Sequence, residues 1–139
     1  MAKLYDIVQT IKNIALSQPS VETSLEGSIY QLNETKDVKY AAVVLTQGQH
    51  TLQDGFIRYN FTIFFVDRLT ASGDNRLIVQ STAVDTLANI INSLSDTDID
   101  LDGDVNITTF TERFEAECAG AYASVAFLLP IEGCAEYIQ

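Results

Sequence analysis

The stretch from Gly55 to Leu94 constrains the fold more than any other part of the chain, because its hydrophobic period changes from two to about four residues within it. In its first half every second residue is apolar, with polar residues between. These apolar residues are Ile57, Tyr59, Phe61, Ile63 and Phe65. Such alternation predicts a strand over 56–66 with one buried face, and from Phe64 onward both faces can be buried.

The second half of this stretch follows a turn at Thr70 to Gly73 and has the period of a helix. Apolar residues recur there at three- and four-residue steps, which is typical of a helix that packs on a sheet. The stripe that we expect to be buried consists of Leu77, Ile78, Val84, Leu87, Ala88, Ile91 and Leu94.

The N-terminal part of the chain adds a helix and two strands. Helical spacing of apolar residues predicts a helix over 3–16, which Pro19 then ends. A strand over 24–32 is weakened by Gly27, which favours an edge or a bend. The strand over 38–46 is apolar on both faces and therefore interior, and we expect these two strands and 56–66 to form a meander.

Two features of the remaining chain concern turns. The polar connection 47–55 ends in Asp-Gly, a strong turn signal. A last pair of strands is predicted over 105–118 and 121–129, joined at Ala119-Gly120. The apolar positions of the first of these strands change parity near Thr108, which predicts a bulge or bend.

This order of elements predicts an α+β fold with one mixed or antiparallel sheet of about five strands and two helices packed on it. A length of 139 residues with 47% hydrophobic residues fits a single domain over 1–139. The N-terminus lacks an apolar signal core, and no apolar run approaches the length of a membrane span. We expect a soluble, unsecreted chain.

The residues that usually carry catalysis are sparse. Cys118 and Cys134 lack the spacing of a zinc or redox site and are predicted to be reduced and at least half-buried. His50, the one histidine, is predicted to be exposed in a loop. Glu115 and Glu117 share a strand face, but a solvated acidic face is expected, because a catalytic pair needs a pocket that separates the two pKa values. We predict no enzymatic activity and no cofactor.

The segment 95–107, SDTDIDLDGDVNI, is the most conspicuous in composition. It matches the opening of a calcium loop, D-x-D-x-D-G, through Asp98, Asp100, Asp102, Gly103 and Asp104. The match breaks at the twelfth position, where Thr109 stands in place of a bidentate Glu. An acidic connection with an Asp-Gly turn and no metal is the default prediction, and a calcium-binding interaction module is the alternative.

The formal net charge is −11, with nineteen acidic residues against eight Lys and Arg. Neutralising phosphates requires clustered Lys and Arg, so this charge argues against a protein that grips nucleic acid. DNA that slides past without adhering remains compatible with it.

The element order resembles that of the tail terminator and head-to-tail joining proteins of tailed bacteriophages. The resemblance is carried by a strand like FIRYNFTIFFVDRL, a short Gly-containing turn, a helix like NRLIVQSTAVDTLANIINSL and a late strand pair. It implies a homo-oligomeric ring, commonly a hexamer, at the neck or head-proximal tail end. There the ring would stop tube growth, contact adjacent neck and tail proteins and let genomic DNA pass. The implied location is the virion, and the host cytoplasm during assembly, with no membrane.

Within such a ring, an acidic lumen would repel DNA phosphates, and an edge strand could extend the sheet of a neighbour. The weak strand at Gly27 and the hairpin around 47–55 are candidates for that contact. Besides the loop from Asp98 to Asp104, the candidate ring or lumen residues are Gln47, His50, Asp54, Glu112, Glu115 and Glu117. Ordinary surface charge that keeps the protein soluble is the alternative.

Overall fold

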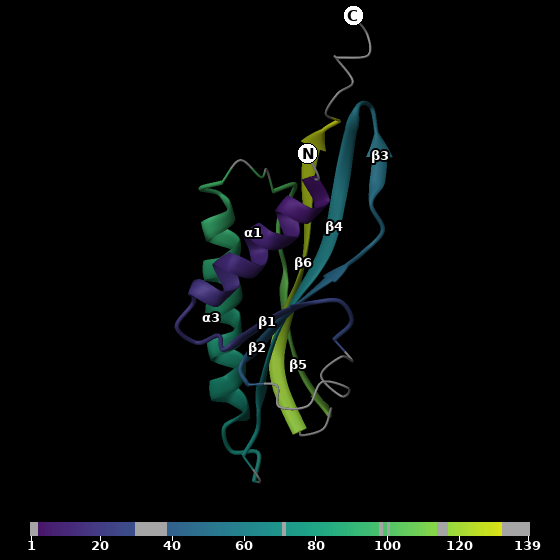
Figure 1. Cartoon of the computed structure of the whole chain (residues 1–139). Coiled ribbons are helices and arrows are strands. Elements are labelled where there is room, and N and C mark those ends of the chain that lie inside the picture. Colours follow the sequence, from purple (N-terminus) through teal and green to yellow (C-terminus); the bar gives the residue numbers. More distant parts are fainter. Residues whose placement is uncertain are drawn as a thin grey trace, which may run out of the picture.

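A computed structural model describes residues 3–29, 39–70, 72–97, 99, 101–113 and 117–131. The elements are α1 (Lys3–Ser17), β1 (Thr23–Glu26), β2 (Ala42–Gln47), β3 (Thr51–Gln53), β4 (Phe56–Arg68), α3 (Arg76–Leu94), β5 (Ile107–Arg113) and β6 (Glu117–Pro130). One mixed sheet has the strand order β1-β2-β4-β6-β5, and β3 pairs with β4 beyond the end of β2. The predicted α+β class, with two helices on a mixed sheet, is confirmed (Figure 1).

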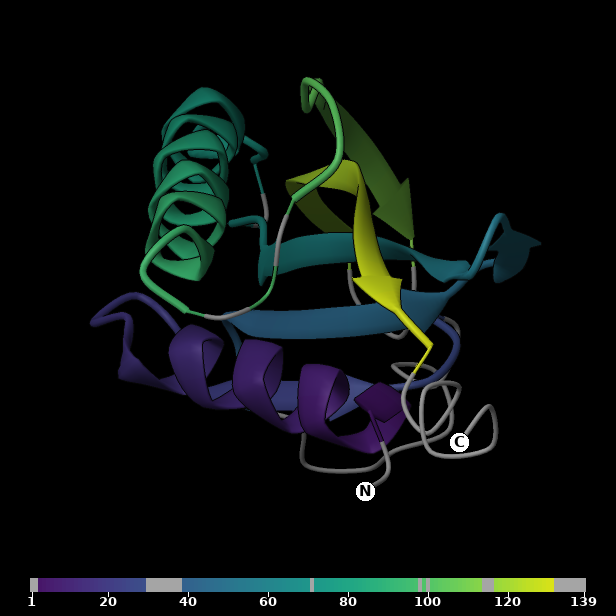
Figure 2. The same cartoon turned by 90° about the horizontal axis from the view of Figure 1, so that it is seen from above.

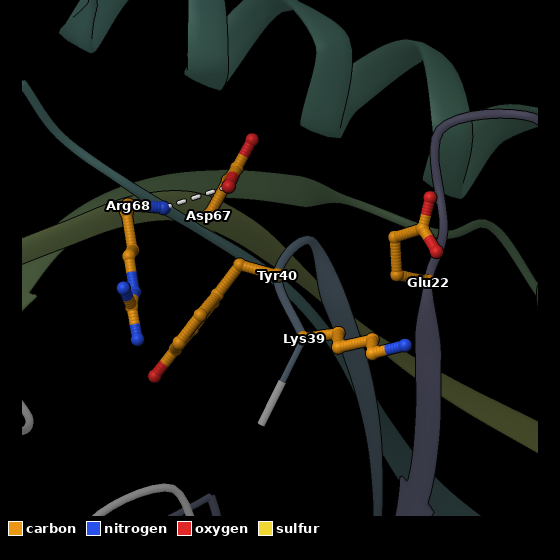
Figure 3. A pocket seen from close by; sticks show the side chains of 5 residues that line it. All are labelled: Glu22, Lys39, Tyr40, Asp67 and Arg68. Carbon is orange, nitrogen blue, oxygen red and sulfur yellow. Dashed lines mark hydrogen bonds between the residues drawn. The ribbon is translucent and has the colours of Figure 1, made fainter. Parts of the chain in front are cut away.

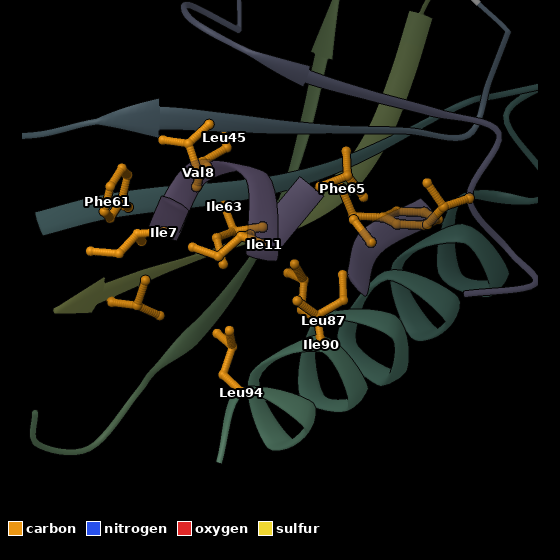
Figure 4. Close-up of a cluster of buried hydrophobic side chains, with 14 of the residues drawn as sticks. Ile7, Val8, Ile11, Leu45, Phe61, Ile63, Phe65, Leu87, Ile90 and Leu94 are labelled. Atoms are coloured by element: carbon orange, nitrogen blue, oxygen red, sulfur yellow. The ribbon is translucent and has the colours of Figure 1, made fainter. Parts of the chain in front are cut away.

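The main core lies between both helices and one face of the sheet (Figures 2 and 4). The odd-numbered residues of β4 point into it, as their alternation predicts, and Phe64 and Val66 point to the opposite face. From α1, predicted within one residue of its observed end, Ile7, Ile11 and Ala15 are fully buried. Strand β4 and helix α1 therefore form where their hydrophobic periods place them.

The buried side of α3 differs from the predicted stripe. Leu77 and Ile78 are 71% and 70% exposed, and Ala88 also faces solvent. The apolar line that faces the sheet is Val79, Ala83, Leu87, Ile90 and Leu94. Its members stand four, four, three and four residues apart, the spacing that keeps one side of a helix inward. Each residue turns a helix by about 100°, so the two residues before this line point away from the sheet.

Strand β1 runs parallel to β2, so the predicted meander is wrong for this pair. A short hairpin would make two successive strands antiparallel. The connection 27–41 is longer than the roughly dozen residues that parallel pairing requires, so both directions are open to β1 and β2. The predicted edge position of β1 and interior position of β2 are confirmed. β1 ends earlier than predicted, at Glu26, and residues 30–38 lie outside the described residues.

The last two strands are also joined elsewhere than predicted. Ala119 and Gly120 are buried inside β6 and do not form a turn. The described strands meet at the Arg113–Glu117 pair, and the register runs without a bulge from the Ile107–Ala123 pair onward. The change of parity near Thr108 has another cause, because β5 contributes apolar side chains to both faces of the sheet. Ile107 packs on the helix side and Phe110 on the other.

The face of the sheet without helices holds a second, smaller apolar cluster. Its buried members are Ala42, Val44, Val66 and Cys118. Rings cover it, with Phe64 and Tyr122 5.6 Å apart between centroids and Phe64 and Phe110 6.3 Å apart. This cluster explains why β2 and the end of β4 are apolar on both faces.

Cys118 is a fully buried thiol in this second cluster, as predicted, and Cys134 lies outside the described residues. Burial raises the pKa of the Cys118 thiol above its ordinary value, although a hydrogen bond with Tyr40 and the charge of Arg68 act in the opposite direction. Because the thiolate is the reactive form, we expect a folded Cys134→Ser variant to react with a thiol reagent at neutral pH about 100-fold more slowly than the unfolded chain. Equal labelling rates with and without denaturant would contradict this burial.

Candidate assembly surface

The β3–β4 hairpin, residues 51–58, projects at one end of the sheet, on the far side of the molecule from α3 (Figures 1 and 2). Asp54 and Gly55 form its two-residue turn with φ of 45° and 83°. Positive φ at both central residues is what a type I′ turn requires, and it explains the Asp-Gly signal. Strand β3 itself was not predicted, because its three residues include a single apolar one.

The base of the hairpin is a bulge at 48–50. Between the last pair of β2 and the first pair of β3, this side of the ladder contains one residue more than β4 does. The backbone N–H of Gly48 donates to the Asn60 carbonyl oxygen at 2.7 Å, and Asn60 Nδ2 donates to the Gln49 carbonyl oxygen at 2.6 Å. Bulges bend a strand and increase its twist. The hairpin therefore leaves the sheet at a fixed, hydrogen-bonded point.

His50 is part of this base and lies in a loop, as predicted, but it is not fully exposed. It is half-buried, with its ring centroid 5.4 Å from Tyr59 and 5.6 Å from Phe61. Its Nδ1 accepts a hydrogen bond from the Asn60 N–H at 3.2 Å, so Nε2 carries the proton and donates to Gln47 Oε1 at 3.1 Å. Both ring nitrogens support the hairpin base, and neither is left over as a general base.

Two large apolar side chains of the hairpin have little protein around them. Leu52 is 71% exposed and Phe56 is 40% exposed. Leu52 stands opposite Ile57, so both side chains lie on the helix side of the sheet. Phe56 is the neighbour of Ile57 in β4, and its side chain therefore points to the other face. The hairpin thus presents one exposed apolar side chain on each face at the end of the sheet.

A groove of about 290 Å³ lies between α1 and the ends of β1 and β2. We call it the α1 groove. The apolar side chains in its lining are Leu4, Tyr5 and Val8, and Lys12 and Gln9 extend the lining along α1. At its strand side, Gln47 Nε2 lies 3.4 Å from Glu26 Oε2.

A wider depression of about 460 Å³ lies where β4 ends (Figure 3). Asp67 and Arg68 lie together at one side of it, and Glu22 and Lys39 lie at the other (Figure 3). The Arg68 guanidinium carbon lies 4.8 Å from the centroid of the Tyr40 ring. Its two carboxylates and two cations cancel in charge. Among its described lining residues there is no histidine and no cysteine.

A single copy of the chain does not bring the predicted ring or lumen residues together. Gln47, His50 and Asp54 lie toward the hairpin end of the sheet, whereas Glu112 and Glu117 lie at the far ends of β5 and β6. The thirteen residues of β4 separate these ends by roughly 40 Å. Glu115, the other half of the predicted acid pair, lies outside the described residues, and Glu117 is exposed.

The acidic segment 95–107 is partly tied to the edge of β6. Leu101 forms a bridge with Phe127, and the Asp102 N–H donates to the Ala126 carbonyl oxygen at 2.7 Å. The Asp102 carboxylate pairs with Arg58, with 3.0 Å between Oδ2 and Nε. Asp104 is exposed.

Two of the four candidate calcium ligands, Asp98 and Asp100, fall outside the described residues. In the part of the chain that the structure describes, no three His, Cys, Asp or Glu side chains are grouped as a metal site would require. Calcium binding by this loop stays a prediction.

The chain matches no protein-family model and no curated protein. Within the described ranges, no helix has the length and apolar character needed to cross a membrane.

Proposed function

We propose that this chain is a structural virion subunit that closes into a homo-oligomeric ring at the neck or head-proximal tail end of a tailed bacteriophage. The ring joins tail to head, contacts the adjacent neck and tail proteins, and lets DNA pass through its lumen. The observation that carries the proposal is the β3–β4 hairpin, which projects from a well-packed sheet with Leu52 exposed and a rigid, hydrogen-bonded base.

The remaining surface is compatible with self-assembly. β1 and β5 are the two outermost strands of the sheet. Each has one backbone edge without a partner among the described strands. Such edges, like a projecting hairpin, can add to the sheet of a neighbouring copy. A contact between two different surfaces of one chain closes into a ring when its rotation allows.

The charge of the chain fits passage of DNA better than binding of DNA. Each copy carries a net charge of −11, so a ring multiplies this charge around its opening. Like charge repels phosphate and keeps the genome from adhering to the wall. Asp54 at one end of the sheet and Glu117 at the other are exposed acids that could line such an opening at two levels.

Native mass spectrometry of the purified full chain tests the proposal. We expect one discrete oligomer of about six copies, with little dimer or trimer between it and the 15.3 kDa monomer, because closing a ring satisfies every contact at once. A chain that stays monomeric at high concentration, even with its neck and tail partners added, would contradict ring formation.

A further inference from the structure

The exposed hairpin and the α1 groove are surfaces of different shape on the same chain. We propose that the Leu52 side of the β3–β4 hairpin of one copy docks in the α1 groove of a second copy, and that this contact repeats around the ring. This inference rests on the ring proposed above and names the two surfaces that form it.

The α1 groove suits side chains better than a small ligand. Its volume of about 290 Å³ falls at the lower limit of small-molecule sites, which begin at roughly 300 Å³. Tyr5, Val8 and Lys12 follow one another at three- and four-residue steps, so they line one side of α1 over about 10 Å. Strand β3 is three residues long and spans a similar distance of about 10 Å.

Leu52 cannot reach the groove of its own copy. It is held in β3, which pairs in register with the start of β4, and its 71% exposure shows that its own chain leaves it uncovered. Tyr5 is similarly uncovered, at 62% exposure. Burying both side chains against each other removes apolar surface from water in two copies at once.

Charge also favours a second copy as the occupant. Lys12, one of only eight Lys and Arg residues, lines the groove, and Asp54 stands at the hairpin turn two residues from Leu52. Neither forms an ion pair within the described part of the chain. Two copies that each carry −11 repel, so pairing a cation with the approaching acid would reduce the repulsion where they meet.

A contact between two different surfaces leaves each copy with one free hairpin and one free groove. It therefore propagates until the ring closes. Loss of either surface should block assembly. A mixture of a variant without the hairpin surface and a variant without the groove surface should form one contact per pair of copies and no ring.

The first experiment measures the oligomer by sedimentation velocity for three variants. Leu52→Ser removes the apolar side chain of the hairpin, and Tyr5→Ser removes that of the groove. Leu77→Ser is the matched control, because Leu77 is equally exposed but lies at the start of α3. We expect the first two to raise the concentration at which the ring dissociates by at least about 10-fold, as central contact residues do, and the control to leave it unchanged. Circular dichroism melting should show all three folded as the wild type.

The second experiment mixes Leu52→Ser and Tyr5→Ser at equal concentrations. The first variant keeps an intact groove and the second an intact hairpin, so the mixture should form heterodimers and stop there. In a separate pair of charge reversals, Asp54→Lys and Lys12→Asp should each weaken the ring, and the double variant should restore it.

The outcomes separate this inference from the proposed function. If the wild type forms rings and both Leu52→Ser and Tyr5→Ser do too, the hairpin–groove contact is wrong and the ring stands. If only Leu52→Ser is impaired, the groove is not the acceptor and the inference is wrong. If the wild type never assembles, both are wrong.

Discussion

Replacing Gly120 with alanine is expected to destabilise the protein by more than about 3 kcal/mol or to prevent folding. Gly120 lies inside β6, where it pairs with Val66 on one side and Phe110 on the other. A Cβ at this position would lie 1.7 Å from the Phe65 carbonyl oxygen and 2.8 Å from its carbonyl carbon. Both atoms belong to the backbone of β4, which cannot rotate away as a side chain can.

Urea denaturation of Gly120→Ala measures this effect, and Gly103→Ala is its control. Gly103 has a φ of 81°, and a Cβ added there would have no neighbouring atom within 4 Å. Alanine at that position therefore meets conformational strain alone, at about 1–2 kcal/mol. A Gly120→Ala protein that unfolds at the wild-type urea concentration would mean that β4 and β6 do not approach as closely as described.

Replacing Leu87 with alanine is expected to cost about 3–4 kcal/mol, because Leu87 is fully buried between α3 and the sheet and a cavity would remain. Leu77→Ala makes the same chemical change on the same helix at a site 71% exposed, and should stay within about 0.5 kcal/mol of the wild type. The free energy of unfolding from urea titration distinguishes them. A larger loss of unfolding free energy at Leu77 than at Leu87 would mean that α3 turns its Leu77 side toward the sheet.

Strand β4 could be predicted because its pattern of apolar residues alone determines it. In β4, strict alternation up to Ile63 predicts one buried face, and the apolar pair at Phe64 and Phe65 predicts that both faces are used beyond it. The structure confirms both statements. The rotation of α3 could not be predicted in the same way. Leu77 and Ile78 are as apolar as the residues that face the sheet, and the choice between two apolar stripes depends on which one fits the strands.

Strand direction and turn position depend on contacts between distant segments. The connection 27–41 is long enough for β1 to pair with β2 in either direction, and only the sheet decides. Glycine is common in turns, which is why a turn was predicted at Ala119-Gly120. Position 120 is glycine for another reason, because the backbone of β4 passes close to it. A single sequence does not distinguish these two uses of glycine.

The candidate assembly surface was only partly predictable. The Asp-Gly pair indicated the turn at Asp54, but Leu52 is one apolar residue in a polar segment and belongs to no period. The α1 groove needs residues from α1 and from the ends of two strands to meet, as Tyr5 and Gln47 do. Composition identified the acids, yet Asp54 and Glu117 lie at opposite ends of the sheet.

Negative-stain electron microscopy of the purified full chain tests the central claim most directly, because it shows closure as well as size. The account predicts annular particles of uniform diameter with a central opening, at concentrations where native mass spectrometry finds a single oligomer. Particles of monomer size at high concentration, or open filaments without a closed form, would contradict it.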